Sequence, residues 1–327
     1  MQMRTLGRSG LKVTSLCLGT MAFGRWIDEA ASARVIDAAL DAGINFFDTA
    51  NIYGRGMDSG DYSLKGESEA ILGRLLGPRR QRIILATKVG NINQHAGPGP
   101  NDRGLSRRHI MEQVERSLRR LQTDYIDLYQ FHSFDPSTPV EESMRAMDDL
   151  VRQGKVRYIG CSNWSAWQLM KAHGVSERLG LERFISVQPQ YSLLVREIER
   201  ELIPCCLAEG VGIIPYSPLA RGLLTGKYRQ GEAPPEQSRA AAGERLLVEG
   251  LMTERNFRRV EAMRRLCAGW GLPMAQVALA WVLANPAVTS AIVGASRPEQ
   301  IGDAVAAAEL RLAPEQKRAL DELVHIE

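Results

Sequence analysis

Short apolar runs alternate along the chain with longer segments in which apolar residues recur every three or four positions. Most of these runs are apolar at nearly every position, whereas a strand with one exposed face would alternate between apolar and polar residues. Strands buried on both faces are typical of a parallel sheet covered by helices. The pattern predicts eight strands, at residues 13–21, 45–50, 83–89, 126–132, 156–163, 185–192, 211–218 and 289–296.

The segments between these runs carry helix signals. Residues 30–42 place an apolar stripe on one helical face, and Gly43 follows where a helix commonly ends. A second apolar stripe begins after Ser106, between Arg and Glu residues. Residues 138–141 predict a capping box with proline at the first helical position, and this helix is expected to stop at Gly154.

Eight strand–helix repeats predict an α/β protein with the (β/α)₈ TIM-barrel fold, as a single domain over residues 1–327. A doubly wound open sheet is the alternative. Residues 3–13 predict a hairpin that turns at Ser9-Gly10 and closes the lower end of the barrel. A long insert, residues 220–288, separates the seventh and eighth strands, and its middle (229–244) is expected to be a mobile loop rich in Pro, Gly and charge.

Composition narrows the classes of function. The chain is 44% hydrophobic and 24% charged, as is usual for a globular protein with a sizeable core. Its net charge of +3 is too small to indicate nucleic acid or a membrane surface as a partner, and no apolar run is long enough to span a bilayer. The N-terminus lacks a signal-peptide core, and the five cysteines form no CxxC pair. We therefore expect reduced thiols, a cytoplasmic location and no metal site.

Polar residues end the predicted strands, although the strand interiors are apolar. In a barrel of this kind the active site lies at the carboxyl ends of the strands. Each polar residue could simply satisfy loop backbone, but a carboxylate, a lysine and a histidine end three successive strands, and this coincidence favours catalysis. The strand-end residues are Thr20, Asp48, Lys88, His132, Ser162, Asn163, Gln188, Tyr216 and Ser296.

Asp48, Lys88 and His132 at three strand ends, together with Tyr53 just beyond Asp48, support general acid catalysis by a tyrosine. A phenol has a reference pKa of about 10, too high for easy proton exchange at neutral pH. An ammonium group nearby lowers that pKa, and a carboxylate keeps the ammonium charged and in place. Asp48, Lys88 and Tyr53 could therefore make Tyr53 a general acid, with His132 orienting a carbonyl oxygen.

Several motifs, in order along nearly the whole chain, resemble the aldo-keto reductase family. They are GINFFDTANIYG, ILATKVG, LYQFH, IGCSNW, VQPQYSLL, IPYSPLARGLLTGKY and AIVGAS. The SPLARGLLTGK version resembles the branch that contains potassium-channel β subunits and bacterial sugar and aldehyde reductases. The resemblance implies a (β/α)₈ barrel that reduces aldehydes or ketones with NAD(P)H. It also implies that Tyr53 is the general acid, that Lys88 and Asp48 tune it, and that His132 orients the substrate.

The resemblance further implies how the cofactor is held, since no GxGxxG fingerprint follows a strand in this chain. Ser162, Asn163 and Gln188 match family residues that bind the nicotinamide carboxamide, and Tyr216 matches the aromatic residue that stacks on the ring. Thr20 and Gly294 match further cofactor contacts. The residues implied around the pyrophosphate are Ser217, Leu219, Arg221, Gly222 and Lys227.

At the adenosine end, Ser296 is expected to be the N-cap of the last barrel helix, whose free N–H groups suit a phosphate. Arg297 is expected to bind the 2′-phosphate and so to select NADPH, and Gln300 and Asp303 match adenine or ribose contacts. Many relatives carry a lysine and an asparagine where this chain has alanines at 295 and 304. Because one arginine carries the argument for the 2′-phosphate, NADH stays open as the cofactor.

The substrate is expected to be a small carbonyl compound, with sugar-derived carbonyls among the candidates. Met21, Trp26 and His132 are the predicted substrate contacts, and further candidates for the pocket wall are Phe23, Tyr62, His95 and Phe134. A cofactor-binding redox sensor is one alternative function. An isomerase or lyase with Lys88 as a Schiff-base nucleophile is another, which Asp48 disfavours because it keeps the amine protonated. Monomer and tetramer both remain open.

Overall fold

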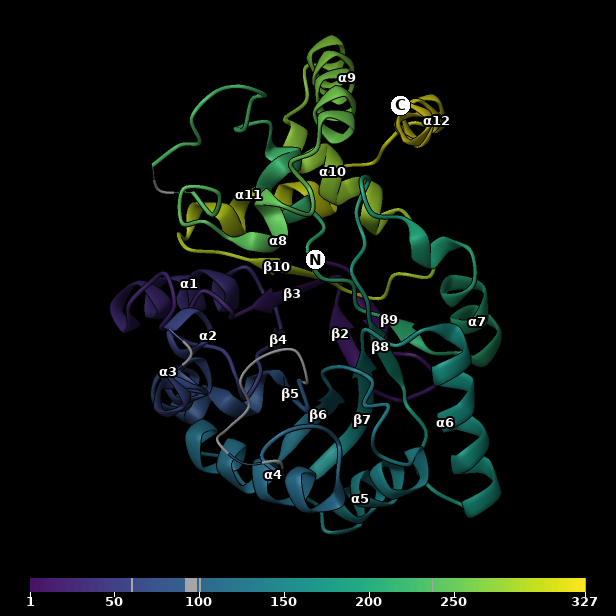
Figure 1. Cartoon of the computed structure of the whole chain (residues 1–327). Coiled ribbons are helices and arrows are strands. Elements are labelled where there is room, and N and C mark those ends of the chain that lie inside the picture. Colours follow the sequence, from purple (N-terminus) through teal and green to yellow (C-terminus); the bar gives the residue numbers. More distant parts are fainter. Residues whose placement is uncertain (60, 92–98, 100, 237, 327) are drawn as a thin grey trace.

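Eight short parallel strands form a closed ring with helices around its outside (Figure 1), so the predicted barrel is confirmed. The computed structural model describes residues 1–59, 61–91, 99, 101–236 and 238–326. All eight predicted apolar runs contain a strand. The barrel strands are β3 (Leu16–Gly19), β4 (Phe46–Asp48), β5 (Ile84–Val89), β6 (Ile126–Phe131), β7 (Val156–Ser162), β8 (Ser186–Gln188), β9 (Gly212–Ile213) and β10 (Ala291–Gly294).

The strand order excludes the doubly wound alternative. Each strand from β3 to β8 pairs in parallel with the next one in the chain, and β10 pairs in parallel with β3. The ring closes between β9 and the segment before β10, where Ile213 bridges Val288 in parallel and Ile292 N–H donates to the carbonyl oxygen of Pro215 at 2.9 Å. All eight strands therefore end at one mouth, and the polar residues at their carboxyl ends meet there.

The helices cover the outside of this ring. They are α1 (Glu29–Asp41), α2 (Gly56–Ser59), α3 (Glu67–Leu76), α4 (Arg107–Leu121), α5 (Val140–Arg152), α6 (Ala166–Leu179), α7 (Leu202–Glu209), α8 (Arg245–Val248), α9 (Glu254–Trp270), α10 (Met274–Leu283), α11 (Glu299–Glu309) and α12 (Pro314–Asp321). The 3₁₀ turns are η1 (Tyr62–Leu64), η2 (Gly77–Arg82), η3 (Glu197–Glu199), η4 (Ala220–Thr225) and η5 (Glu322–His325). Ser106 is the N-cap of α4, since its side chain accepts from His109 N–H.

Two predicted helix caps are wrong. Thr138 does not cap α5, because its hydroxyl donates to Asp135 at 2.7 Å and the N-cap position falls on Pro139. Ser296 does not cap α11, because the helix begins only at Glu299, with Pro298 as its N-cap. Pro298 also disfavours helical backbone in Arg297, the residue before it.

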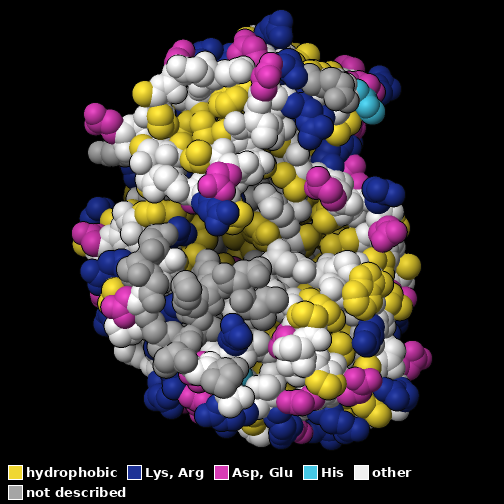
Figure 2. Space-filling view, in the orientation of Figure 1, with side chains coloured by type: hydrophobic (Ala, Val, Ile, Leu, Met, Phe, Trp, Pro, Cys, Tyr) yellow, Lys and Arg dark blue, Asp and Glu magenta, His cyan; other side chains and the backbone are white. Residues whose placement is uncertain are grey.

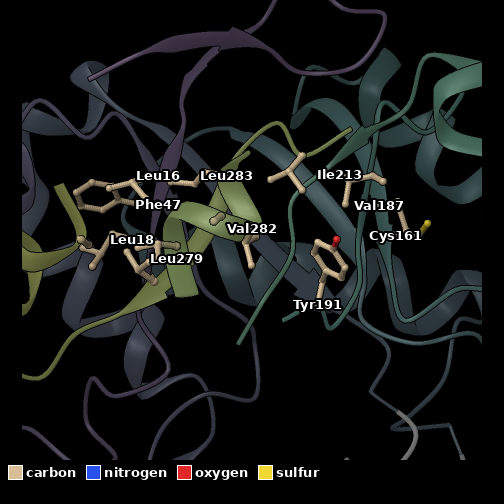
Figure 3. Packing of buried hydrophobic residues seen from close by; sticks show 14 of the residues in the cluster. Leu16, Leu18, Phe47, Cys161, Val187, Tyr191, Ile213, Leu279, Val282 and Leu283 are labelled. Carbon is tan, nitrogen blue, oxygen red and sulfur yellow. The ribbon is translucent and has the colours of Figure 1, made fainter. Parts of the chain in front are cut away.

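The core has two layers. The larger one lies between the strands and the surrounding helices, and Figure 3 shows part of it, including Leu16 and Phe47 from the barrel with Leu279 from α10. The smaller one fills the barrel interior. It contains Leu6 and Val13 from the N-terminal hairpin, which is formed by β1 (Met3–Thr5) and β2 (Lys12–Thr14). The predicted hairpin is therefore present, and its apolar residues close the barrel from below.

The long insert carries η4, α8 and α9 before α10. Its middle, residues 229–244, contains no helix or strand within its described part. No single helix among the described residues is long and apolar enough to cross a membrane. The α9 and α10 pair reaches that length and apolarity together but bends by 98° between its two members.

Candidate active site

The buried ion pair at the barrel mouth joins two neighbouring strands. Asp48 ends β4 and Lys88 lies near the end of β5, and their exposed fractions are 2% and 0%. The Lys88 ammonium contacts the Asp48 carboxylate and also donates to the carbonyl oxygen of Thr49 at 2.9 Å. Burying either charge alone would be strongly unfavourable, and pairing with further hydrogen bonds offsets that desolvation.

Tyr53 lies on the loop that follows β4, and this loop folds back over the pair. Asn51 N–H donates to the carbonyl oxygen of Lys88 at 3.2 Å, and Tyr53 N–H donates to that of Ala50 at 3.1 Å. The Lys88 ammonium is 3.2 Å from the Tyr53 hydroxyl and 4.9 Å from the centre of its ring. Asp48, Lys88 and Tyr53 are thus joined in one hydrogen-bonded chain.

The pKa of Tyr53 is shifted upward, whereas the sequence predicted that the Lys88 ammonium would lower it. Burial raises the pKa of the phenol, and although the Lys88 ammonium lowers it, the net pKa lies above the ordinary value. For Lys88, burial lowers the pKa, but the Asp48 carboxylate and Tyr53 outweigh burial and leave that pKa raised. Tyr53 therefore keeps its proton at neutral pH, as an acid must, and Lys88 stays charged beside it.

His132 directly follows β6 and faces Tyr53. Its ring lies edge-on to that of Tyr53 with centroids 5.9 Å apart, and its Nδ1 is buried without a hydrogen-bond partner in the part of the chain that the structure describes. Burial, reinforced by the Lys88 charge, holds the pKa of His132 well below its usual range. The imidazole is therefore neutral at physiological pH and can donate one N–H to a carbonyl oxygen.

This neutral histidine predicts a dependence of stability on pH. Below about pH 6.5 the unfolded chain protonates the histidine while the folded state does not, so the unfolded state binds more protons and the free energy of unfolding falls on acidification. Urea denaturation between pH 7.5 and 5 should show a shallower fall for His132→Gln than for wild type. His325→Gln, at a side chain 74% exposed, should keep the wild-type slope. If the free energy of unfolding depended on pH equally in wild type and His132→Gln, His132 would not be a buried neutral histidine.

The second oxygen of Asp48 is bound by two amides. Gln188 Nε2 donates to Asp48 Oδ1 at 2.9 Å, and Gln130 Nε2 donates to the same oxygen at 3.1 Å. Sequence reasoning assigned Gln188 only to the cofactor and missed Gln130. A signal for it exists, because a glutamine two residues before His132 points to the same side of β6 as the histidine.

The nicotinamide-site candidates form a second connected group. Asn163 Nδ2 donates to the carbonyl oxygen of His132 at 3.0 Å and to Ser162 Oγ at 3.1 Å, and Asn163 Oδ1 accepts from the Tyr216 hydroxyl at 2.9 Å. Ser162 Oγ donates to the carbonyl oxygen of Gln188 at 2.8 Å. The structure brings all four residues together beside the Asp48–Lys88 pair, with the amide of Asn163 held by its protein neighbours.

The loop after β9 has unusual backbone. Ser217, Ala220 and Arg221 have φ values of 56°, 47° and 58°, followed by Gly222 at 99°. Left-handed backbone in non-glycine residues costs about 1–2 kcal/mol each, and such strain is concentrated at functional sites. The predicted pyrophosphate contacts Ser217, Leu219, Arg221 and Gly222 lie on this loop, and the Lys227 side chain lies against Gly222.

The insert returns to this loop and makes contacts that the sequence did not predict. The Arg221 guanidinium forms an ion pair with Glu244, and both side chains are at most 10% exposed. Arg239, from the same segment, lies with its guanidinium carbon 4.7 Å from the centre of the Trp26 ring. One Arg239 nitrogen is 3.5 Å from where a Cβ on Gly294 would be. The Arg239 guanidinium makes no hydrogen bond or ion pair with the other described residues, so its donors are available to an anionic ligand.

The adenosine-end candidates are more exposed. Arg297 and Asp303 are both on the surface near the start of α11. Gln300 turns back, and its Oε1 accepts from Ser296 N–H at 2.8 Å. Thr20 is fully buried, and its hydroxyl contacts the carbonyl oxygen of Asp48 at 3.1 Å rather than projecting into the mouth.

The predicted substrate contacts have different environments. Met21 and Trp26 are half-buried at the mouth, which is hollowed and partly lined by hydrophobic side chains in Figure 2. Phe23 is fully buried in the core and so cannot line an open pocket. Phe134 packs edge-on against Trp164 with ring centres 5.0 Å apart. His95 and the side chain of Tyr62 lie outside the described residues. Among those that are described, no three His, Cys, Asp or Glu side chains are placed to hold a metal ion.

The chain was compared with protein-family models and with known proteins, and the matches agree on one family. The model of the aldo/keto reductase family matches residues 15–325. An uncharacterized oxidoreductase, YrpG, of Bacillus subtilis is 42% identical, with 99% of this chain and 96% of the relative covered. A probable voltage-gated potassium channel subunit beta of Arabidopsis thaliana is 39% identical, with 92% of this chain and 89% of the relative covered. The versiconal hemiacetal acetate reductase of Aspergillus parasiticus is 38% identical, with 98% of this chain and 96% of the relative covered.

The family match spans nearly the whole barrel, and several relatives carry the names of oxidoreductases. The chain is therefore an enzyme of oxidoreductase type, and it belongs to the aldo/keto reductase family.

Proposed function

We propose that the protein is an NADPH-dependent reductase that converts aldehydes or ketones to alcohols. The observation that carries the proposal is the hydrogen-bonded chain from Asp48 through Lys88 to Tyr53, next to a neutral His132. This chain keeps a proton on a phenol at the mouth of the barrel and keeps a positive charge beside it. A carbonyl oxygen that gains electrons needs such a proton donor.

The residues at the mouth fit a nicotinamide dinucleotide. The donors of Arg239, together with the strained loop that carries Arg221, provide positive charge and backbone N–H groups for phosphates. Gln188 has its Nε2 committed to Asp48, and its Oε1 can accept from a carboxamide. The bound cofactor would supply the hydride, which protein side chains cannot provide.

The protein's own residues would handle the oxygen and the proton. His132 donates an N–H to the substrate carbonyl oxygen, polarises it and orients it toward Tyr53. Tyr53 gives its proton to that oxygen as the carbonyl carbon is reduced. The Lys88 ammonium stabilises the resulting phenolate, and Asp48 holds the ammonium in place. The buried ion pair also keeps the Lys88 amine protonated, which disfavours the Schiff-base alternative.

Turnover is tested by mixing purified protein with NADPH and a panel of aliphatic, aromatic and sugar aldehydes while cofactor absorbance is followed. Aldehyde-dependent consumption of NADPH with formation of the alcohol is expected. Tight cofactor binding without consumption for any carbonyl would overturn the proposal. That outcome would favour the second candidate, a cofactor-binding regulatory subunit, which the relatives named as potassium channel subunits beta suggest.

Arg297→Ala is expected to weaken NADPH binding by about tenfold or more and NADH binding much less. The reason is that a 2′-phosphate, absent from NADH, forms charge-assisted hydrogen bonds with a guanidinium. Fluorescence titration of both cofactors measures the two dissociation constants. Arg318→Ala, at another exposed arginine, serves as the control and should change neither. Equal losses for both cofactors in Arg297→Ala would show that Arg297 does not read the 2′-phosphate.

A cytoplasmic location is also proposed. All five cysteines are free and at least partly buried, which suits a reducing compartment.

A further inference from the structure

A fully buried glutamine, Gln130, donates a hydrogen bond to Asp48 but is not itself the donor of the proton proposed to leave Tyr53. Gln130 is 0% exposed and sits on β6, in register with Lys88 on β5 and Gly160 on β7. Burying an amide costs free energy unless its groups are hydrogen-bonded. Its position inside the barrel is therefore set by what the amide contacts.

The neighbouring strand leaves room for this side chain. A Cβ on Gly160 would lie 3.4 Å from Gln130 Cγ and 2.6 Å from Ser186 Oγ. A larger residue at 160 would therefore crowd Ser186 on β8, whereas Gln130 lies at ordinary contact distance from this position.

Two amides meet one carboxylate oxygen. Because carboxylate oxygens only accept, the amide nitrogens of Gln130 and Gln188 must both face Asp48 Oδ1. Gln188 Nε2 is also 3.4 Å from Gln130 Oε1, so Gln130 steadies the second amide as well. Asp48 Oδ2 is left to the Lys88 ammonium.

We propose that Gln130 is a positioning residue for proton transfer, which holds the Asp48 carboxylate turned toward Lys88 without touching the substrate. The inference rests on the proposed function, because the proton transfer belongs to Tyr53. Hydrogen bonds from two uncharged amides fix the orientation of the carboxylate without adding a charge that would compete with Lys88. The fixed carboxylate in turn keeps the ammonium at the Tyr53 hydroxyl.

Among the described residues, the titratable groups nearest Gln130 belong to the buried pair, to β3 and to the barrel mouth. Asp48 approaches from β4, Lys88 from β5 and Cys17 from β3, with Tyr53 and His132 nearer the mouth. Burial, with Asp48 adding to it, raises the pKa of the Cys17 thiol far above its usual range, so this thiol stays neutral. A change of charge at position 130 should therefore be felt mainly by Asp48, Lys88 and Tyr53.

The decisive variant is Gln130→Glu, which has nearly the same shape. While protonated, the introduced carboxyl can donate to Asp48 as the amide does. Once ionised, it places a second negative charge beside Asp48, and two adjacent carboxylates repel. We expect the ratio of variant to wild-type kcat/KM to be within a few-fold of one at pH 6 and to fall by about tenfold or more at pH 9.

Two further variants separate positioning from packing. Gln130→Met keeps the volume without a donor or a charge, and its kcat/KM should be about tenfold below wild type at every pH. Gln113→Glu is the matched control, since Gln113 is also buried but contacts Asn51 and not Asp48, and its ratio should not change with pH. A ratio for Gln130→Glu that is flat with pH would overturn the inference and leave Gln130 as a space-filling residue.

Stability provides a readout that does not depend on turnover. The free energy of unfolding of Gln130→Glu should fall as pH rises, because the folded state holds the introduced carboxyl protonated longer than the unfolded state does. Adding Asp48→Asn should remove most of this fall. An equal fall with and without Asp48→Asn would contradict the contact with Asp48, whereas an inactive wild-type protein would contradict only the proposed function.

Discussion

Tyr53→Phe is expected to lower kcat for aldehyde reduction by about 10²–10⁴-fold, because general acid catalysis contributes that much and phenylalanine has no proton to give. The aromatic ring and its edge-on contact with His132 are retained, so substrate and cofactor binding should change little. Single-turnover mixing of enzyme, NADPH and aldehyde measures the chemical step directly. Its rate constant should fall in parallel with kcat.

Tyr129→Phe is the matched control for this experiment. Tyr129 is fully buried in the outer core, and its hydroxyl has no hydrogen-bond partner among the described residues, so removing that hydroxyl should leave kcat unchanged. Undiminished turnover in Tyr53→Phe would remove Tyr53 from the mechanism. An equal loss in both variants would point instead to a general effect of removing a buried phenol.

Lys88→Met is expected to destabilise the protein by about 3–5 kcal/mol, because it leaves the buried Asp48 carboxylate without its cation. Reduction should also be largely lost, since nothing then stabilises the Tyr53 phenolate. Urea denaturation gives the free energy of unfolding. The surface variant Lys155→Met, which breaks an ion pair with the exposed Glu115, should cost about 1 kcal/mol or less.

A second substitution tests the reason for this loss. Asp48→Asn added to Lys88→Met removes the unpaired charge, so it should recover a substantial part of the stability. It should recover no activity, because the ammonium beside Tyr53 is still missing. If Lys88→Met lowers the free energy of unfolding no more than Lys155→Met does, Lys88 does not compensate a buried charge on Asp48, and the inference from the structure is wrong.

The repeating pattern of apolar runs predicted the barrel well, since strands buried on both faces need apolar residues at nearly every position. The ends of the strands were predicted less well. The run at 211–218 contains only the two-residue strand β9 (Gly212–Ile213), and the remaining residues turn into the strained loop at Ser217. Hydrophobicity reports burial, and buried loop residues at a barrel mouth look the same in sequence as strand residues.

Local rules also failed where other contacts or burial acted on the same groups. Thr138 had the sequence of a helix cap, but Asp135, three residues earlier, accepts its hydroxyl. The ammonium beside Tyr53 predicted a lowered pKa, but burial of the phenol outweighs it. The first competitor is local in the chain, whereas the burial of Tyr53 arises only on folding.

The sequence by itself determined the fold class and predicted Asp48, Tyr53, Lys88 and His132 at the barrel mouth, because spacing along parallel strands determines which residues reach the mouth. Only the tertiary structure showed that Gln130 binds Asp48, that Glu244 pairs with Arg221 and that Arg239 lies over Trp26. Those contacts join residues that lie 23 to 213 positions apart in the chain and that no periodicity relates. Their pairing depends on the path of the insert and on the space left inside the barrel.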